Sequence, residues 1–369
     1  MKILVTGGLG FIGSHIVDAL VEKGHEVRVL DCLEYQVHQG MFPAYANPAA
    51  EYIIGNVLDP ELLKVALKDI EIVFHEAAMV GMGQSQYQIF KYTNVNVSGT
   101  AQLLDAIVNG NLPIKKLIVA ASMSSYGEGL YSCPSCGLVS PPMRSAEQIA
   151  AKEWDLKCPS CNGPLQPVPT PETKSLDSSA VYSLTKKYQE EMCLSVGRTY
   201  GIPVVALRYF NVYGPRQSLS NPYTGVAAIF MSRIKNGNPP FIYEDGLQSR
   251  DFVHVEDVAA ANVFVMEHSS ADNEKFNVGT GNPITIKDMA ERLITGAGVE
   301  LEPFISNEGR AGDVRHCSAD VSKLKGLGFE HKYPELNIAT LLDWSQSVSA
   351  RDEFEAARVE LAQKLARGS

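Results

Sequence analysis

The stretch Lys2-Ile-Leu-Val-Thr-Gly-Gly-Leu-Gly-Phe-Ile-Gly-Ser-His15 decides the fold of this chain. Its apolar run at residues 3–5 predicts a buried parallel strand, and the apolar spacing after Ile12 predicts a helix. Between them, Gly7, Gly8, Gly10 and Gly13 form a turn that lets the backbone approach a phosphate closely. Since the first N–H groups of the helix then face that anion, the stretch predicts a dinucleotide pyrophosphate site.

An acidic residue supports this interpretation and indicates which dinucleotide binds. Residues 27–30 read as a second strand, and Asp31 ends it, 18 residues after Gly13. A carboxylate there accepts hydrogen bonds from the adenosine ribose hydroxyls and repels a 2′-phosphate, so NAD is favoured over NADP. The alternative is a tight turn in some other α/β protein, which the strand and Asp31 together disfavour.

Composition and charge exclude several classes of protein. The chain has 369 residues, of which 32 are Lys or Arg and 42 are Asp or Glu, for a net charge of −10. This charge argues against a broad nucleic-acid-binding face. We expect no signal peptide and no membrane span, and therefore a cytoplasmic protein. In that setting the seven cysteines read as thiols or metal ligands rather than disulfides.

Strand and helix patterns alternate through the first half of the chain. Strands are predicted at residues 51–54, 71–75, 116–121 and 204–209, and helices at 59–67, 92–108 and 180–200. This alternation predicts an α/β fold, a Rossmann-type doubly wound parallel sheet with ligands at the carboxyl ends of its strands.

Breaks in this alternation predict the domain organisation. We expect an NAD-binding domain at residues 1–127 and 176–215, interrupted by a four-cysteine insert at 128–175. A smaller C-terminal α/β substrate lobe should follow at 216–345, with part of this segment returning to the NAD-binding domain. A C-terminal helix is predicted at 346–369.

Tyr182-Ser-Leu-Thr-Lys186 is the candidate for proton transfer. Residues at i and i+4 share one helix face, so the ammonium of Lys186 lies near the Tyr182 phenol. A phenol has a pKa near ~10, and a neighbouring positive charge favours the phenolate. The phenolate could then take a proton from a sugar hydroxyl. The alternative is an ordinary surface pair, because this spacing is common on helices.

The insert carries two Cys-x-x-Cys knuckles, Cys133-Pro-Ser-Cys136 and Cys158-Pro-Ser-Cys161, separated by 21 residues. Four thiolates at this spacing predict a structural zinc site, and a pair of disulfides is the alternative. A site with four protein ligands has no open position for catalysis. Because the insert falls between Ser122 and Tyr182, we expect it to shape the substrate pocket or an oligomer contact.

Several motifs in order resemble one family. They are residues 6–13, Asp31, His75-Glu-Ala-Ala78, Asn96-Val-Ser-Gly-Thr100, Ser122 through Gly127, Tyr182 with Lys186, Leu207 through Pro215, and Arg250 through Asp257. The chain from Met1 to about Trp344 resembles the extended short-chain dehydrogenase/reductases that modify nucleotide sugars. The insert and the final helix lie outside the resemblance.

The resemblance implies a role for each matching residue. Ser122, Tyr182 and Lys186 would be catalytic, with Lys186 also holding the nicotinamide ribose. NAD would be bound by Gly7, Gly10, Phe11, Ile12, Gly13, Asp31, Asn56, Val57, Ala77, Ala78, Met79, Asn96, Tyr182, Lys186 and Phe210. The nucleotide sugar would contact Ser122, Ser124, Asn211, Thr224, Val226, Arg250, Arg310 and Asp313. Asn56-Val57 departs from the family, which commonly has an aspartate at the first position.

The family catalyses 4-epimerisation, 4,6-dehydration and net oxidation or reduction. Its dehydratases carry Asp-Glu after the active Ser or Thr, where this chain has Met123-Ser124. The resemblance therefore favours a 4-epimerase that works through a transient 4-keto sugar. A Rossmann-type protein that binds NAD without turnover is the alternative from another class. The helices at 92–108 and 180–200 resemble the family's dimer interface, so we expect a homodimer.

Overall fold

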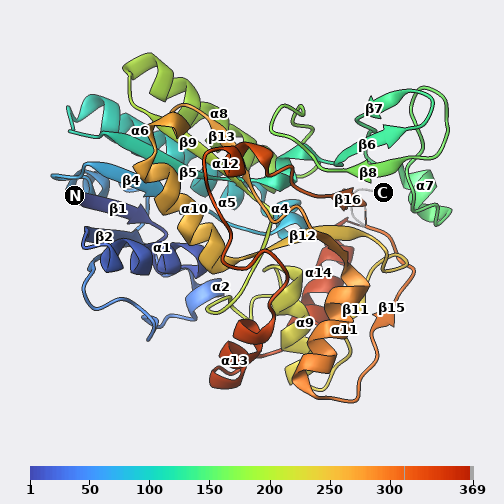
Figure 1. The fold of residues 1–369 in the computed structure, drawn as a ribbon. Coiled ribbons are helices and arrows are strands. Elements are labelled where there is room, and N and C mark those ends of the chain that lie inside the picture. The colour runs from blue at the N-terminus through green and yellow to red at the C-terminus, as the bar shows by residue number, and fades with distance from the viewer. Residues whose placement is uncertain (311, 366–369) are drawn as a thin grey trace.

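The computed structural model describes residues 1–310 and 312–365. Its centre is a seven-stranded parallel sheet in the order β3-β2-β1-β4-β5-β9-β13 (Figure 1). The strands are β1 (Lys2–Thr6), β2 (Glu26–Asp31), β3 (Glu51–Ile54), β4 (Ile72–His75), β5 (Lys116–Ser122), β9 (Val204–Tyr209) and β13 (Lys275–Val278). The predicted fold class is confirmed, and each strand predicted in the first half lies within about a residue of its observed position.

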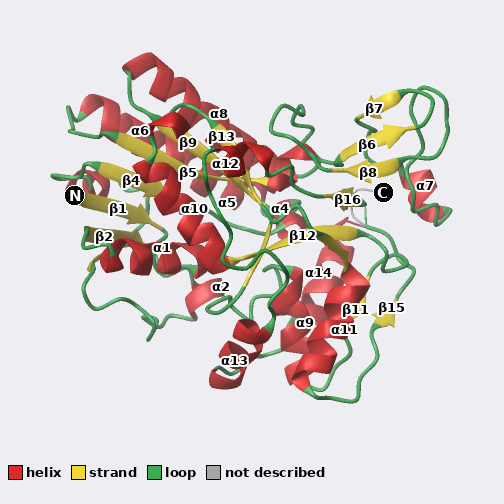
Figure 2. Ribbon diagram, viewed as in Figure 1, coloured by secondary structure: helices red, strands yellow, loops and turns green. Residues whose placement is uncertain are grey.

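Helices cover both faces of this sheet (Figure 2). Because side chains alternate along a strand, Ile3 and Val5 pack with α1 (Phe11–Glu22) and α10 (Val255–Glu267), while Leu4 faces the opposite layer. That layer contains α3 (Pro60–Ala66), α6 (Gly99–Asn109) and α8 (Val181–Tyr200). Burial on both faces explains the continuous apolar runs of the strands.

The second half of the chain builds a smaller α/β unit below the sheet in Figure 1. Its strands are β10 (Asn211–Tyr213), β11 (Phe241–Ile242), β12 (Ser249–His254), β14 (Pro283–Thr285), β15 (Phe304–Ile305) and β16 (His316–Cys317). Helices α9 (Val226–Lys235), α11 (Ile286–Ala297) and α13 (Ala339–Ser347) bury Phe230, Met289 and Leu341 in one core. This unit therefore has an apolar core of its own.

The cysteine-bearing segment forms a small antiparallel sheet at one end of the molecule (Figure 1). It consists of β6 (Leu130–Cys133), β7 (Gly137–Val139), β8 (Gln166–Val168) and the short helix α7 (Ala146–Ala150). The remaining short helices are α2 (Tyr35–His38), α4 (Met82–Ser85), α5 (Ile89–Tyr92), η1 (Thr93–Ser98), η2 (Met123–Tyr126), η3 (Ser269–Ala271) and α12 (Ser322–Gly326).

The C-terminal helix predicted at residues 346–369 needs correction. Helix α13 ends at Ser347, and a separate helix α14 begins at Phe354 and runs to Leu365. Val348 is extended, and the Asp352 carboxylate accepts from the N–H of Phe354 at 3.1 Å, in a turn that precedes α14. Residues 366–369 lie outside the described part of the chain. Among the described residues, no helix has the length and apolar character needed to cross a bilayer.

Candidate active site

The glycine turn after β1 has room only for glycine. A Cβ at Gly7, where φ is +72°, would lie 2.8 Å from the Ala77 nitrogen, and one at Gly13 would lie 2.2 Å from the Gly7 carbonyl oxygen. Helix α1 begins at Phe11 with no side-chain cap and no acidic residue in its first turn. Its uncapped N–H groups fit an anion, so the turn fits the diphosphate of a dinucleotide.

Asp31 ends β2 beside this turn. Its carboxylate accepts from the N–H of Leu9 at 3.0 Å and from the N–H of Leu33 at 2.9 Å. Asp31, which is predicted to bind the adenosine ribose, therefore also stabilises the backbone of the glycine turn.

The segment after β4 lies next to the turn, with Ala77 and Ala78 half-buried and Met79 buried. Asn96 supports it from the π-helical segment η1. The Asn96 side chain accepts from the N–H of Met79 at 2.7 Å and donates to Thr185 Oγ1 at 2.9 Å. Asn96 is completely buried and supports this segment, and its contact with the cofactor stays a prediction.

Asn56 and Val57 are the residues predicted to contact the adenine. The Val57 side chain is 4% exposed and packs in the core, where a Cβ on Gly99 would lie 2.7 Å from Val57 Cγ2. Asn56 Oδ1 accepts from the N–H of Leu58 at 3.0 Å. The Val57 side chain is thus a packing group, and only its backbone and the rest of the Asn56 amide can face a ligand.

Tyr182 and Lys186 lie near Ser122 at the carboxyl end of β5. Lys186 Nζ donates to the carbonyl oxygen of Ala120, two residues before Ser122, at 3.0 Å. Burial raises the pKa of Tyr182 to about 12, and a hydrogen bond with Ser122 opposes the rise. Burial lowers the pKa of Lys186 to about 8, and the negative charge of Glu76 opposes the fall. The three predicted catalytic residues therefore lie together.

Glu76 is a functional candidate to which the sequence analysis gave no role. Burial raises the pKa of Glu76 to about 7, while the Lys186 ammonium and the Tyr209 hydrogen bond lower it. The Tyr209 hydroxyl donates to Glu76 Oε1 at 3.0 Å and also bonds the Asn262 amide. The sequence does contain a signal for this role. Glu76 is an acidic residue directly after an apolar strand, and ligands bind at the carboxyl ends of the strands in such a sheet.

Ser122 and Ser124 share a hydrogen bond of 2.9 Å between their hydroxyl groups. Ser122 Oγ also accepts from the Ser124 N–H at 3.2 Å and so caps η2. Phe210, predicted beside the nicotinamide, is 4% exposed and packs near Tyr126, with ring centroids 6.4 Å apart. The two serine hydroxyls are thus hydrogen-bonded to each other and lie near the apolar side chains of Phe210 and Tyr126.

Three predicted substrate residues lie along the β10–α9 connection. Within the described residues, Asn211 Oδ1 is buried without a hydrogen-bond partner, as a ligand-binding amide would be. Thr224 and Val226 flank Gly225, which begins α9 with no side-chain cap. The start of α9 therefore offers N–H groups to an anion.

Arg250, Arg310 and Asp313 are engaged within the chain. The Arg250 guanidinium donates to the carbonyl oxygens of Ser249 at 2.8 Å and Arg315 at 3.2 Å. Arg310 donates to both carboxylate oxygens of Asp313, at 2.8 and 3.1 Å. The predicted contact of these arginines with the nucleotide sugar would use guanidinium N–H groups that are not in these bonds. Otherwise the nucleotide sugar would have to replace the present hydrogen-bond acceptors.

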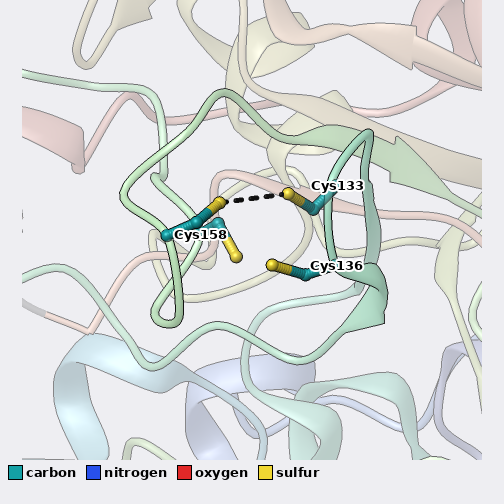
Figure 3. Close-up of side chains that lie close together, drawn as sticks. Cys133, Cys136 and Cys158 are labelled. Carbon is teal, nitrogen blue, oxygen red and sulfur yellow. Dashed lines mark hydrogen bonds between the residues drawn. The ribbon is translucent and has the colours of Figure 1, made fainter.

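The four insert cysteines converge as predicted, and Figure 3 shows the Cys133, Cys136 and Cys158 side chains gathered around one centre. All four Sγ atoms lie within 4.8 Å of one another, and those of Cys133 and Cys161 are 3.5 Å apart. Tetrahedral zinc with Zn–S bonds of about 2.3 Å places its sulfurs about 3.8 Å apart. A backbone hydrogen bond at Ser160 lowers the pKa of Cys158 to about 7. All four cysteines are free thiols, so the set fits a tetrahedral metal.

Comparisons with known proteins identify the family of this chain. Residues 158–279 match the NAD dependent epimerase/dehydratase family, and residues 4–134 match the 3-beta hydroxysteroid dehydrogenase/isomerase family. A dTDP-L-rhamnose 4-epimerase from Burkholderia thailandensis is 35% identical over 352 residues, covering 93% of this chain and 94% of that protein.

Solved structures give the same picture. UDP-glucose 4-epimerase from Thermotoga maritima with UDP-glucose superposes with a TM-score of 0.74 at 31% identity, covering 97% of this chain and 100% of that one. UDP-glucose 4-epimerase from Thermus thermophilus with NAD has a TM-score of 0.74 at 27% identity, covering 95% and 100%. The chain belongs to the extended short-chain dehydrogenase/reductases, in the nucleotide-sugar epimerase/dehydratase family. It is an isomerase, an NAD-dependent nucleotide-sugar epimerase.

Proposed function

We propose that this protein is a 4-epimerase that interconverts dTDP-L-rhamnose and dTDP-6-deoxy-L-talose. The observation that carries the proposal is the convergence of Tyr182, Lys186 and Ser122 at the carboxyl end of β5. This group faces the same edge of the sheet as the glycine turn.

In this proposal Tyr182 takes the proton from the sugar 4-hydroxyl and later returns it. Bound NAD supplies the hydride acceptor and donor for the same carbon. Burial alone holds the phenol protonated at neutral pH, so the phenolate depends on positive charge near the ring. Lys186, one helical turn away, supplies such a charge in its ammonium form, and Ser122 with Ser124 orients the sugar hydroxyl.

Elimination of water is disfavoured by the residue after Ser122. Met123 is 8% exposed and packs with Phe210 and Val314 in an apolar cluster. A thioether can neither donate nor accept the proton that loss of water from the neighbouring carbons requires. The site therefore supports reversible oxidation at one carbon, which is what epimerisation needs.

The identity of the sugar rests on two lines of support. The ending Tyr126-Gly-Glu-Gly129, the double-knuckle insert and the loop at residues 216–226 resemble bacterial dTDP-L-rhamnose 4-epimerases, and the Burkholderia thailandensis relative bears that name. UDP-glucose/UDP-galactose 4-epimerase is the second candidate, favoured by the Thermotoga maritima structure with UDP-glucose.

One experiment separates these candidates. The purified protein is incubated with dTDP-L-rhamnose and, separately, with UDP-glucose, and the products are identified by NMR. We expect a C4 epimer from dTDP-L-rhamnose, with no net change in nicotinamide absorbance during turnover. Turnover of UDP-glucose alone would replace the proposed substrate. Stoichiometric NADH formation would contradict epimerisation and indicate a dehydrogenase.

The proposal includes a structural zinc ion and a homodimer. Cys133, Cys136, Cys158 and Cys161 would hold the zinc as thiolates, and the ion would join the two knuckles of the insert. The dimer would form through the helices at 92–108, which are η1 and α6, and 180–200, which is α8. Large apolar side chains are exposed on α8 and on the neighbouring α5, namely Leu184, Tyr188, Ile89 and Phe90. Several exposed large apolar side chains on neighbouring helices are typical of a protein interface.

A further inference from the structure

Both ends of the insert hold one short segment on the substrate side, residues 313–319. At the start of the insert, the N–H of Gly129 donates to the carbonyl oxygen of His316 at 3.0 Å. At its other end, the N–H of Thr170 donates to the carbonyl oxygen of Ser318 at 2.8 Å. The insert therefore enters and leaves the fold against the same stretch of backbone.

Five charged residues, which we call the insert–lobe cluster, join the body of the insert to this segment. The Arg315 guanidinium donates to the Asp155 carboxylate at 3.0 and 3.1 Å and to Asp245 at 2.7 and 2.9 Å. Arg315 and Arg144 bind the two oxygens of Glu244, at 3.0 and 2.7 Å. The side chains of Arg144, Glu244 and Arg315 are at most 2% exposed, so these charges depend on one another.

The insert also reaches the residues predicted to meet the nucleotide sugar. Arg144 donates to the carbonyl oxygen of Asp313 at 2.8 Å, and Asp313 is the residue that binds Arg310. Trp154 and α7 cover Gly309, where a Cβ would lie 2.9 Å from Trp154 Cζ3. Polar and apolar contacts from the insert thus restrain both sides of Arg310.

The cysteines lie close to these contacts along the chain. Cys158 follows Asp155 by three residues, with the buried Leu156 between them. Cys133 is the last residue of β6, the strand that pairs with both other strands of the insert. A metal that gathers the four sulfurs would therefore fix the position of Asp155 relative to the small sheet.

We propose that the insert is a clamp that orders the nucleotide-sugar side of the active site. Arg144 and Asp155 act in it as positioning residues, working through Arg315 and Asp313. The clamp rests on the proposed function only for the identity of the ligand. Loss of Asp155 or of the metal should loosen residues 313–319 and weaken nucleotide binding, and should leave the NAD site intact.

The test compares Asp155→Ala with the control Glu153→Ala. The Asp155 side chain is 84% exposed, so its removal leaves no cavity. Among the described residues, the Glu153 carboxylate forms its one ion pair with Lys157 of the insert, at 3.2 Å. We measure amide hydrogen exchange over residues 312–319 and the Kd for dTDP and for UDP. Asp155→Ala should speed the exchange several-fold and raise the Kd about three- to tenfold. NAD content should be unchanged, and the control should match the wild type.

Two further experiments test whether the clamp depends on the metal. Cys136→Ser alters an exposed cysteine, and EDTA treatment of the wild type changes no residue. Both should speed exchange over residues 312–319. Unchanged exchange in Asp155→Ala and in the metal-depleted wild type would overturn the clamp. A wild type that binds neither dTDP nor UDP would contradict the proposed function instead, and the exchange result would still decide the clamp.

Discussion

The N–H of Leu9 donates to the Asp31 carboxylate at 3.0 Å, which ties the glycine turn to the end of the neighbouring strand. The same carboxylate accepts from Leu33, so its two oxygens are oriented by backbone donors on either side. This arrangement fixes a negative charge where a dinucleotide would place its adenosine ribose.

Asp31→Asn should weaken the discrimination against NADP. An amide retains one acceptor for the backbone but has no negative charge to repel a 2′-phosphate. We expect the ratio of NADP(H) to NAD(H) affinity to rise about tenfold, which corresponds to about 1.4 kcal/mol. Fluorescence titration of the cofactor-free enzyme with NADH and NADPH measures this ratio. An unchanged ratio would show that Asp31 does not face the ribose.

Tyr182→Phe should remove turnover and spare cofactor binding. Loss of a general acid–base group typically lowers the rate about 10²- to 10⁴-fold. Tyr188→Phe is the matched control, because Tyr188 lies on the same helix and its side chain is 54% exposed. The rate is followed by NMR and the bound NAD by release and absorbance. Near-normal turnover in Tyr182→Phe would refute the proposed base.

Glu76→Gln should move the alkaline limb of the pH–rate profile to lower pH. Glu76 has a pKa of about 7, so it is mainly ionised above that pH and there raises the pKa of Lys186. Without this charge, Lys186 loses its proton at a lower pH, and with it the positive charge beside Tyr182. Tyr209, which donates a hydrogen bond to Glu76, is uncharged in this range.

The measurement is kcat between about pH 5.5 and pH 9.5. Glu76→Asp retains the negative charge, so the alkaline limb of its pH–rate profile should lie closer to that of the wild type. The two enzymes should differ least below pH 7, where Glu76 itself is mainly protonated. A limb that stays fixed or moves to higher pH in Glu76→Gln would show that Glu76 does not act on Lys186.

Cys133→Ser should abolish stoichiometric zinc binding and lower the Tm. Cys133 is a buried member of the sulfur cluster, and metal binding energy adds directly to folding energy in such sites. Cys32→Ser alters an exposed cysteine outside the cluster and should change neither quantity. Zinc per chain is measured by plasma mass spectrometry and Tm by calorimetry. Full zinc content in Cys133→Ser would mean that the metal binds elsewhere.

Leu184→Glu should convert the proposed dimer to a monomer. The Leu184 side chain is 42% exposed on α8, so a charge there should be harmless in the monomer and costly in a buried interface. Leu247→Glu is the control, because Leu247 is 53% exposed in the substrate lobe. Light scattering after size exclusion gives the mass. A wild-type monomer, or a variant that remains dimeric, would contradict this interface.

Local patterns predicted most of the fold and the centre of the site. The apolar run at β1, the glycine turn and the Tyr182–Lys186 spacing depend on residues close in sequence, and the structure keeps them as predicted. The hydrogen-bond partners of Asn96 and Arg250 could not be predicted in this way, because Met79, Thr185 and Arg315 are up to 89 residues away.

The insert–lobe cluster could not be predicted for the same reason. Arg144, Glu244 and Arg315 meet only where the insert packs on the substrate lobe, and nothing in their local sequence indicates the pairing. Glu76 acquires its raised pKa from burial, which single-sequence spacing does not show.

The two ends of the insert meet where the N–H of Leu130 donates to Thr170 Oγ1 at 3.0 Å. A segment that departs and returns at one point can be gained or lost as a cassette, without shifting the register of the seven-stranded sheet. The four-cysteine module therefore leaves the catalytic scaffold and returns to it at one junction. Grafting the module into a relative at this junction should also transfer its contacts with the segment equivalent to residues 313–319.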